Sequence, residues 1–203
     1  MKYLITGGSG RLGTQLKKYF KGYYPTHKEF DITKFTATEH NFIVHMASYT
    51  NVDKAETERF ECFRTNVEGT YNLLRHFAHI PFVFISTEHV NAQGVYWQSK
   101  LVGELLVKNL ASEYLIIRTL FKPSPWPFEY AFTDQFTQGD YVDIIAPLIA
   151  KEIKKWDGKS KVVYVGTGRK SMFELAKRTK PDVKPNSVRD VPLKRPKDYL
   201  PKL

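Results

Sequence analysis

Short apolar runs alternate with amphipathic stretches along the chain of 203 residues. The apolar runs have the length and the β-branched and aromatic content of buried strands, whereas the stretches between them repeat their apolar positions with a helical period. This alternation is typical of repeated βαβ units, in which helices cover a parallel sheet. We therefore expect strands at Tyr3–Thr6, Gly22–Tyr24, Phe42–Met46, Phe82–Ser86, Tyr114–Arg118 and Val162–Val165.

The same pattern predicts helices at Arg11–Lys21, about Ala55–His79, Gln98–Ala111, Val142–Trp156 and Met172–Lys177. Pro123–Pro127 is predicted to be a loop, because each proline removes a backbone donor and restricts the residue before it. The proline-rich tail after Lys180 should be extended or irregular. The expected architecture is one Rossmann-type α/β domain over residues 1–203 with a doubly wound parallel sheet.

The first expected strand leads directly into a glycine-rich loop. Gly7, Gly10 and Gly13 follow Tyr3–Thr6, and a helical pattern starts inside the loop at Leu12. In a dinucleotide site, one glycine allows the sharp turn, one lets backbone N–H groups approach the pyrophosphate, and one lets the helix lie close to the sheet. The N–H groups at the start of the helix attract phosphate. This order of strand, glycines and helix therefore predicts a dinucleotide site.

A second group of candidate residues follows the expected strand Phe82–Ser86. Thr87 lies at its carboxyl end, and Tyr96 and Lys100 follow, spaced four positions apart. Residues four apart on a helix share a face, so the phenol and the ammonium can point into one cleft. We expect the ammonium to lower the pKa of the phenol, and the Thr87 hydroxyl to bind a reacting carbonyl oxygen. A chance Tyr–Lys pair on a surface helix is the alternative.

Composition narrows the class of protein further. Hydrophobic residues make up 42% and charged residues 26% of the chain, which is ordinary for a globular protein. No apolar run approaches the roughly 18 residues of a membrane span, and no signal-peptide pattern is present at the start. Cys62 is the only cysteine, which excludes an intrachain disulfide. We expect a cytoplasmic protein without a metal site, since His45, His76, His79 and His89 show no ligand spacing.

The formal net charge of +10 admits two interpretations. A basic surface can bind nucleic acid, or it can favour small anionic molecules. The basic residues are spread along the chain, which disfavours nucleic acid. We expect a phosphate-bearing cofactor and a nucleotide-linked substrate.

Several of these segments resemble the extended short-chain dehydrogenase/reductases, and among them most closely the dTDP-4-dehydrorhamnose reductases. The resemblance runs from residue 1 to about 120, and beyond it only Asp134–Phe136 and Arg195–Lys197 agree. It implies NAD(P)H-dependent reduction of a 4-keto group on a nucleotide-linked 6-deoxy sugar or a related carbonyl compound. The matching segments are Thr6–Gly13, Asp31–Thr33, His45–Glu56, Asn66–Leu74, Ile85–Thr87, Val95–Glu104 and Arg118–Thr119.

The resemblance also implies roles for individual residues. Tyr96 would protonate the carbonyl oxygen, Lys100 would bind the nicotinamide ribose, and Thr87 would complete the catalytic set. Phe121 and Gln135 would lie on the substrate side. Among the cofactor contacts, Asp31 and Ile32 would flank the adenine, and Ala47, Ser48 and Thr50 would line the nicotinamide-ribose side. The full set of cofactor contacts would be Gly7, Gly10, Arg11, Leu12, Gly13, Asp31, Ile32, Ala47, Ser48, Thr50, Tyr96 and Lys100.

Some of these residues also have a purely structural interpretation. Ala47 and Ile32 are alternatively packing residues. Asp31 is alternatively the cap of the segment that starts at Ile32.

The chain departs from the family pattern in two places. Thr26, His27 and Lys28 stand where a carboxylate binds the adenosine ribose of NAD, which favours NADP(H) slightly over NAD(H). A solvated basic loop is the alternative for these residues. Tyr96 follows Thr87 after only nine positions, and the substrate-binding region over about 121–203 is reduced.

Two other functions stay open at this stage. Glu88 stands beside Thr87 as the added acid that a nucleotide-sugar dehydratase would use, so an epimerase or dehydratase is one alternative. A non-catalytic dinucleotide-binding regulatory subunit is the other. By resemblance, the helical stretches around residues 55–79 and 98–111 would form the contact of a homodimer.

Overall fold

The computed structural model describes residues 2–35 and 39–191. In this part of the chain a parallel sheet forms the centre, with the strand order β1-β2-β3-β4-β9. The fold class expected from the sequence, an α/β protein of Rossmann type, is confirmed. The strands are β1 (Tyr3–Thr6), β2 (Phe42–His45), β3 (Phe82–Thr87), β4 (Tyr114–Thr119) and β9 (Lys161–Tyr164).

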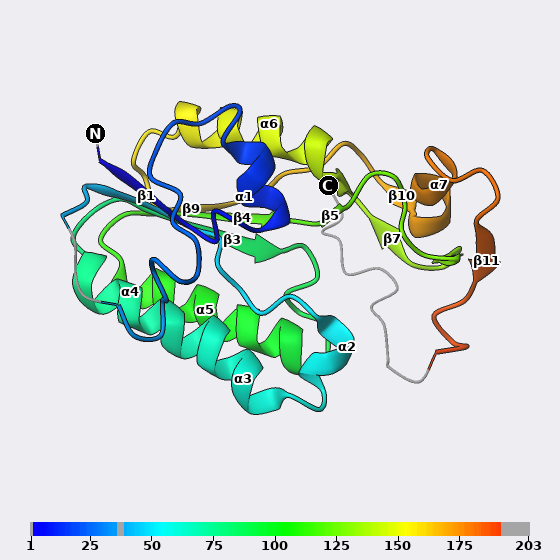
Figure 1. The fold of residues 1–203 in the computed structure, drawn as a ribbon, viewed down its shortest axis with the longest axis horizontal. Helices are drawn as coiled ribbons and strands as arrows, with labels where there is room; N and C mark the ends of the chain where they lie inside the picture. The colour runs from blue at the N-terminus through cyan, green and yellow to red at the C-terminus, as the bar shows by residue number, and fades with distance from the viewer. Residues whose placement is uncertain (1, 36–38, 192–203) are drawn as a thin grey trace.

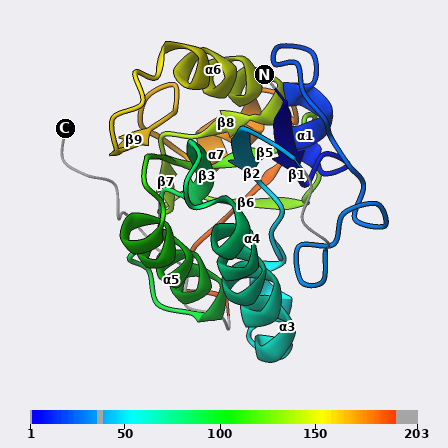
Figure 2. The ribbon, with the colours of Figure 1, turned by 90° about the vertical axis from the view of Figure 1, so that its left-hand side faces the viewer.

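Helices cover both faces of this sheet (Figure 1). One face carries α1 (Arg11–Leu16) and α6 (Val142–Lys155), and the other carries α4 (Gly69–Phe77) and α5 (Val95–Leu110). The view along the sheet in Figure 2 shows the same two layers of helices. Before α4 the chain forms α2 (Val52–Ala55), α3 (Arg59–Phe63) and the π-helix η1 (Arg64–Glu68).

Strand β3 shows why the two layers form. All of its residues are buried, and successive side chains point to opposite faces of the sheet. Val83 and Ile85 pack in the cluster with α1 and α6, while Phe82 and Phe84 pack in the cluster with α4 and α5. Each such side chain stabilises the fold by roughly 1.5–3 kcal/mol through burial.

A smaller group of elements follows β4 and forms what we call the C-terminal lobe, residues 120–141 and 166–191. Its strands pair as β5–β8, β6–β11 and β7–β10. Tyr141, Met172 and Leu175 are buried in a core of its own. The elements are β5 (Phe121–Lys122), β6 (Tyr130–Phe132), β7 (Phe136–Thr137), β8 (Asp140–Tyr141), β10 (Lys170–Ser171), α7 (Met172–Lys177) and β11 (Lys184–Asn186).

The strand expected at Gly22–Tyr24 is wrong as an element. Tyr23 lies at the outer edge of β1 and exchanges backbone hydrogen bonds with Tyr3 and Ile5, but it forms only an isolated bridge. Pro25 follows two residues later and has no N–H to continue the ladder. The pattern therefore placed the segment correctly in the sheet and overestimated its length.

The helix expected over Ala55–His79 is broken in the structure. Asn51 caps α2, accepting a hydrogen bond from the backbone of Lys54, so the helical region begins before Ala55. A turn then separates α2 from α3, and η1 inserts a wider turn before α4. A π-helix has one more residue per hydrogen-bonded turn than an α-helix. The spacing of apolar residues does not show one such turn, so the sequence could not reveal η1.

Smaller differences concern helix ends. Helix α1 ends at Leu16 rather than at Lys21, where the chain continues in turns. Helix α5 begins at Val95, three residues before the expected start, because Gly94 adopts a φ of +125° that turns the chain into the helix. Both Tyr96 and Lys100 therefore belong to α5.

Other expectations are confirmed. Residues 123–127 lie outside helices and strands, and α7 has the expected bounds. The tail after Lys180 contains the short extended strand β11. The tail beyond residue 191, with Arg195–Lys197, lies outside the described residues.

Candidate active site

The fold requires glycine at Gly7, in the loop between β1 and α1, and at Gly13, within α1. Gly7 has a φ of +73°, and a Cβ there would lie 2.7 Å from the backbone nitrogen of Ala47. A Cβ at Gly13 would lie 2.5 Å from the carbonyl oxygen of Gly7. Backbone atoms cannot move aside as a flexible side chain can, so a larger residue at either position would displace the loop.

Gly10 is less crowded than Gly7 and Gly13. Among the described residues, a Cβ there would meet only the Gly7 carbonyl oxygen, at 3.2 Å. Gly10 is the N-cap of α1, and no side chain caps the helix. Arg11 is exposed beside it, whereas Leu12 is buried in the core. The loop thus presents backbone N–H groups in an open cradle, which fits a pyrophosphate group.

The structure brings Lys100 to the strand that ends in Thr87. The Lys100 ammonium is buried and donates a hydrogen bond to the Ile85 carbonyl oxygen at 2.9 Å. It also lies over the Phe84 ring, 4.2 Å from the ring centroid. The two residues that follow on β3, Ser86 and Thr87, are also buried. The Lys100 ammonium of α5 therefore reaches β3 two residues before Thr87.

The hydroxyls at this edge differ in their partners. Thr87 Oγ1 accepts a hydrogen bond from the backbone N–H of His89 at 3.3 Å. The Ser86 hydroxyl is buried without a hydrogen-bond partner among the described residues. Because alternate residues of a strand share a face, Ser86 lies on the same side of β3 as Phe84, the ring that contacts Lys100. An unpartnered buried hydroxyl is costly and marks a place where a ligand or water is accommodated.

The electrostatics differ from the expectation for Tyr96. Burial raises the pKa of Tyr96 to about 12, instead of a neighbouring ammonium lowering it. Burial also lowers the pKa of Lys100 to about 8, and the nearby Glu104 carboxylate opposes this shift. The expected lowering fails because the Lys100 ammonium is directed to Ile85 on β3. At neutral pH the phenol is therefore protonated and the amine is mostly charged.

Asn66, in η1, organises this region and received no role from the sequence. Its Oδ1 accepts hydrogen bonds from the Ser48 hydroxyl at 2.8 Å and from the Tyr49 backbone at 2.7 Å. Its Nδ2 donates to the Ser99 hydroxyl at 2.8 Å. Ser99 lies between Tyr96 and Lys100 in the sequence of α5, so Asn66 joins the segment after β2 to the helix with both residues. The sequence offered one signal for this role, because the amide of Asn66 falls among the apolar positions of the expected helix over 55–79.

The residues expected on the nicotinamide side, Ala47, Ser48 and Thr50, follow β2 directly. The Ala47 N–H donates to Thr6 Oγ1 at 3.2 Å, and Ala47 also packs on the core. Ser48 is held by Asn66, whereas Thr50 is exposed. All three thus lie on the stretch that runs beside Gly7, but only Ala47 and Ser48 are fixed by contacts.

The residues expected near the adenine and its ribose show structural roles. Asp31 accepts hydrogen bonds from the backbone and hydroxyl of Thr33, which is the capping role considered as its alternative. Ile32 is buried, and a Cβ at Gly69 would meet its Cδ1 at 2.5 Å. His27 and Lys28 are exposed, and His27 Nε2 lies 3.7 Å from the Asp31 carboxylate.

Glu88 is turned toward the C-terminal lobe. Its carboxylate accepts a short hydrogen bond from the Thr137 hydroxyl and another from the Gln138 backbone at 3.0 Å. Burial raises the pKa of this carboxyl group. Phe121 is half-buried on β5 against the main core, and Gln135 is buried just before β7. Both residues expected on the substrate side thus belong to the C-terminal lobe, which the Glu88 contacts attach to β3.

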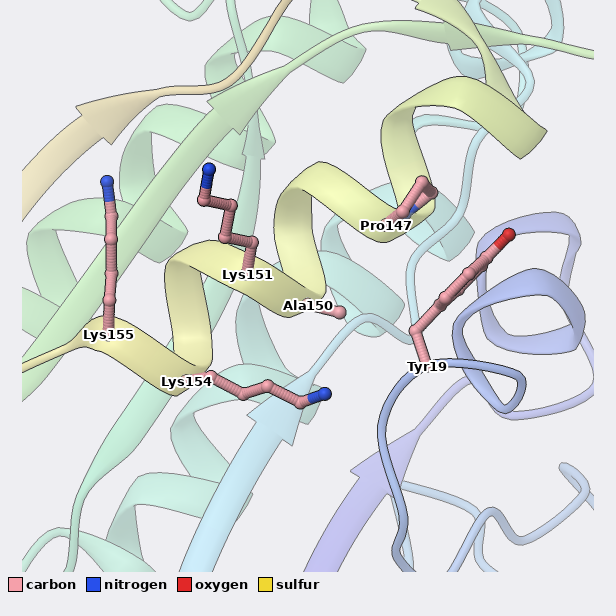
Figure 3. Close-up of a pocket in the computed structure, with 6 residues that line it drawn as sticks. All are labelled: Tyr19, Pro147, Ala150, Lys151, Lys154 and Lys155. Carbon is pink, nitrogen blue, oxygen red and sulfur yellow. The ribbon is translucent and has the colours of Figure 1, made fainter.

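A surface hollow of about 410 Å³ lies between α1 and α6, on the face of the sheet opposite α5. Figure 3 shows Lys154 extending toward the Tyr19 side, while Lys151 and Lys155 point away from it. Lys155 pairs with Glu152 at 2.6 Å. The hollow is therefore separate from the Tyr96–Lys100 region.

The described residues hold neither a metal-ion cluster nor a membrane-spanning helix. Within residues 2–35 and 39–191, no group of three or more His, Cys, Asp or Glu side chains is arranged to hold a metal ion. None of the helices in the same ranges has the length and apolar character needed to cross a bilayer.

Comparison with known proteins places these features in a family. The sequence profile described as "RmlD substrate binding domain" matches residues 1–144. A "dTDP-4-dehydrorhamnose reductase" of Aggregatibacter actinomycetemcomitans is 30% identical over 148 residues, which are 58% of this chain and 50% of that protein. "Spore coat polysaccharide biosynthesis protein SpsK" of Bacillus subtilis is also 30% identical, over 58% of this chain and 52% of its own. The chain spans about half the length of these curated relatives.

Solved structures agree over more of the chain. The dTDP-4-dehydrorhamnose reductase of Bacillus anthracis, in complex with NADP, superposes with a TM-score of 0.80 at 26% identity, over 98% of this chain and 90% of its own. The corresponding protein of Clostridium acetobutylicum gives a TM-score of 0.83 at 26% identity, over 98% and 89% of the two chains.

The glycine loop generates a prediction that separates fold from binding. We expect Gly10→Val to leave the free energy of unfolding within about 1 kcal/mol of the wild type, because its Cβ would meet one atom, the Gly7 carbonyl oxygen, which need shift by only a few tenths of an ångström. Its side chain would fill the cradle, so the dissociation constant for NADPH should rise on the order of tenfold or more, measured by fluorescence titration. The matched control is Gly13→Ala, which should lose about 2 kcal/mol or more, because its Cβ meets backbone. Unchanged affinity in Gly10→Val would contradict the placement of the phosphates.

The buried ammonium of Lys100 generates a second prediction. A folded-state pKa of about 8, below the ordinary 10.5, means that the charged form costs about 3 kcal/mol of stability at pH 7. This cost shrinks as pH rises from 8 toward 10.5, where the unfolded chain also loses its proton. Lys100→Met should therefore be more stable than the wild type at pH 7, and the difference should shrink by pH 9.5. Urea denaturation at both values measures it, and a pH-independent difference would refute desolvation of the ammonium as the cause.

Proposed function

The chain belongs to the RmlD substrate binding domain family, and from this premise we propose that it is an NAD(P)H-dependent reductase of a nucleotide-linked 4-keto-6-deoxy sugar or a related carbonyl compound. The observation that carries the proposal is the hydrogen bond that ties Lys100, four residues after Tyr96 on α5, to β3, the strand that ends in Thr87. Helix α5 sends the Lys100 ammonium under the strand that ends in Thr87. The names of the relatives support the class of substrate.

The protonation states at this edge suit reduction of a carbonyl group. A reduced nicotinamide, when bound at the glycine loop, supplies the hydride. Tyr96 keeps its proton at neutral pH, since its pKa is about 12, so its hydroxyl can donate that proton to the carbonyl oxygen as negative charge develops there. Lys100, one helical turn along α5, would bind the nicotinamide ribose. Thr87 would hold the carbonyl oxygen by a hydrogen bond.

We infer a preference for NADP(H) over NAD(H). The loop after Tyr23 exposes His27 and Lys28, whose side chains suit a ribose 2′-phosphate. The carboxylate in this loop, Glu29, accepts a hydrogen bond from the Thr26 backbone at 2.7 Å, so it is directed back onto its own loop. The Bacillus anthracis relative with NADP bound supports the same preference.

The alternatives receive less support from the structure. A dehydratase would use Glu88 as an acid beside Thr87, but this carboxylate is held by Thr137 and Gln138 of the C-terminal lobe. A regulatory subunit that only binds a dinucleotide has no need of Thr87, Tyr96 and Lys100 together. We therefore propose the reductase as the main function.

The decisive experiment removes one oxygen atom. Tyr96→Phe should lower kcat by a factor of about 10² to 10⁴, because a general acid contributes this much. Its affinity for NADPH should remain, with NADPH binding more tightly than NADH. The measurement is oxidation of the reduced cofactor with a panel of nucleotide-linked 4-keto sugars. Tyr71→Phe, at an exposed position of α4, is the matched control.

Two outcomes would contradict the proposal. Full turnover by Tyr96→Phe would exclude the phenol as the acid. Tight cofactor binding by the wild type without turnover of any carbonyl compound would favour the regulatory subunit instead.

We also propose that the protein forms a homodimer through α3 and α5, as the family resemblance implies. These helices contact each other and expose Phe60, Leu105 and Leu110 to solvent, with Phe60 71% exposed. Such apolar groups on adjacent helices indicate an interaction surface.

Sedimentation should show a dimer for the wild type and a monomer for Leu105→Glu, because a carboxylate would be buried against its symmetry mate. Tyr130→Glu places the same charge on an equally exposed aromatic position of the C-terminal lobe and should leave the dimer intact. A wild-type monomer at micromolar concentration would refute this assembly.

A further inference from the structure

His45, at the end of β2, occupies an unusual position for a histidine. It is 1% exposed and lies between two hydroxyl groups from different elements. Its Nδ1 is 2.8 Å from Thr6 Oγ1 at the end of β1, and its Nε2 is 2.9 Å from Thr70 Oγ1 on α4. The imidazole therefore spans the space between the glycine-loop strand and the helix that follows η1.

The hydrogen bonds around the ring fix the direction of each proton. Thr6 Oγ1 accepts from the backbone N–H groups of Met46 and Ala47, each at 3.2 Å. Both of its lone pairs are thus used, and its own proton is donated to Nδ1 of His45. The ring is neutral, because burial lowers the pKa of His45 to about 3 and the Lys100 ammonium adds to the effect. A neutral ring that accepts at Nδ1 carries its proton on Nε2.

The chain of hydrogen bonds continues from the other side of the ring. The Nε2 proton is donated to Thr70 Oγ1, and the Thr70 hydroxyl donates in turn to the Asn66 carbonyl oxygen at 2.7 Å. Every donor from Thr6 to Asn66 then has an acceptor. Reversing the tautomer would place two donors face to face at Thr6 and leave the Thr70 oxygen without the Nε2 proton.

Both ends of this chain reach the candidate active site. Thr6 precedes Gly7, and the Ala47 nitrogen that Thr6 binds is the backbone against which Gly7 packs. At the other end, Asn66 holds Ser48 and also Ser99, which stands between the two candidate catalytic residues of α5. His45 itself is separated from the cradle at Gly10 by these residues.

We propose that His45 is a positioning residue: as the neutral Nε2–H tautomer, it sets the glycine loop and the Ala47–Ser48 stretch relative to Asn66 and α5. This inference rests on the proposed dinucleotide-dependent function. A displacement of about 1 Å between a bound cofactor and the catalytic groups can cost on the order of 100-fold in rate. A residue that touches neither substrate nor cofactor would thus control both affinity and turnover.

The competing explanation is that His45 only fills space. It packs against Phe82 and Phe84, with ring centroids 6.1 and 5.5 Å away. A set of substitutions separates packing from hydrogen bonding. His45→Gln can reach Thr70 with its amide, His45→Asn can reach only Thr6, and His45→Leu fills the volume without either bond.

Cofactor titration and steady-state kinetics measure the effect, at a temperature where circular dichroism shows each variant folded. We expect His45→Leu to raise the dissociation constant for NADPH about tenfold or more and to lower kcat, with partial recovery in His45→Gln and His45→Asn. His76→Gln, on the exposed side of α4, is the matched control and should behave as the wild type. Wild-type affinity and kcat in a folded His45→Leu would overturn the proposal.

A measurement on the unaltered protein keeps the test independent of variants that fail to fold. Nitrogen NMR of ¹⁵N-histidine-labelled protein should show His45 protonated on Nε2 only, with no titration between pH 5 and pH 8. The groups facing the ring are Thr6, Thr70, the two phenyl rings of β3 and the Lys100 ammonium, so no carboxylate among them favours the charged form. The opposite tautomer, or an ordinary titration, would overturn the proposal.

These results are distinguishable from a failure of the proposed function. A wild-type protein that binds NADPH but reduces no carbonyl compound would refute the reductase. The tautomer and the NADPH affinity of the His45 variants would still decide the role of His45.

Discussion

The hydrogen bond from the Lys100 ammonium to the Ile85 carbonyl oxygen is the interaction on which the rest of the candidate site depends. Burying an ammonium opposes folding, and the low pKa of Lys100 records that cost. One carbonyl oxygen and one aromatic face, that of Phe84, do not offset it fully. A side chain that costs stability where methionine would pack is a sign of chemistry, since active sites keep groups that the fold alone would not select.

This arrangement places strict demands on the surrounding polar groups. Helix α5 must stay in register with β3, and the glycine loop must stay in register with both. The bond from Lys100 to Ile85 meets the first demand. Thr6, His45 and Asn66 meet the second, through the backbone after β2 and through Ser99. Within a dry interior such groups are stable only as a complete network, because each unpaired donor would cost about 1–3 kcal/mol. The network therefore fixes one arrangement of three elements that are far apart in the sequence.

The sequence predicted the parts of this arrangement that follow from local chemistry. The glycines, the hydroxyl end of β3 and the Tyr96–Lys100 spacing are readable because each depends on a turn, an apolar run or a helical period. The bridging residues are not readable in this way. His45 and Asn66 act through Thr6, Thr70 and Ser99, and these pairings exist only once the sheet has formed. The same limit explains the lowered pKa wrongly expected for Tyr96, since helical spacing does not reveal that the Lys100 ammonium is directed to β3.

The C-terminal lobe contacts the chain directly after β3. Strand β3 ends at Thr87, and the next residue already binds the lobe. The next residue, Glu88, is bound by Thr137 and Gln138, and its backbone N–H donates to Thr119 at the end of β4. The segment between Thr87 and the start of α5 is short. Its first residue, Glu88, is hydrogen-bonded to Thr137 of β7. The lobe is thereby held at the edge of the sheet where Thr87 and Tyr96 lie. For the proposed reductase, this attachment would hold the reduced substrate region one residue from the candidate catalytic threonine.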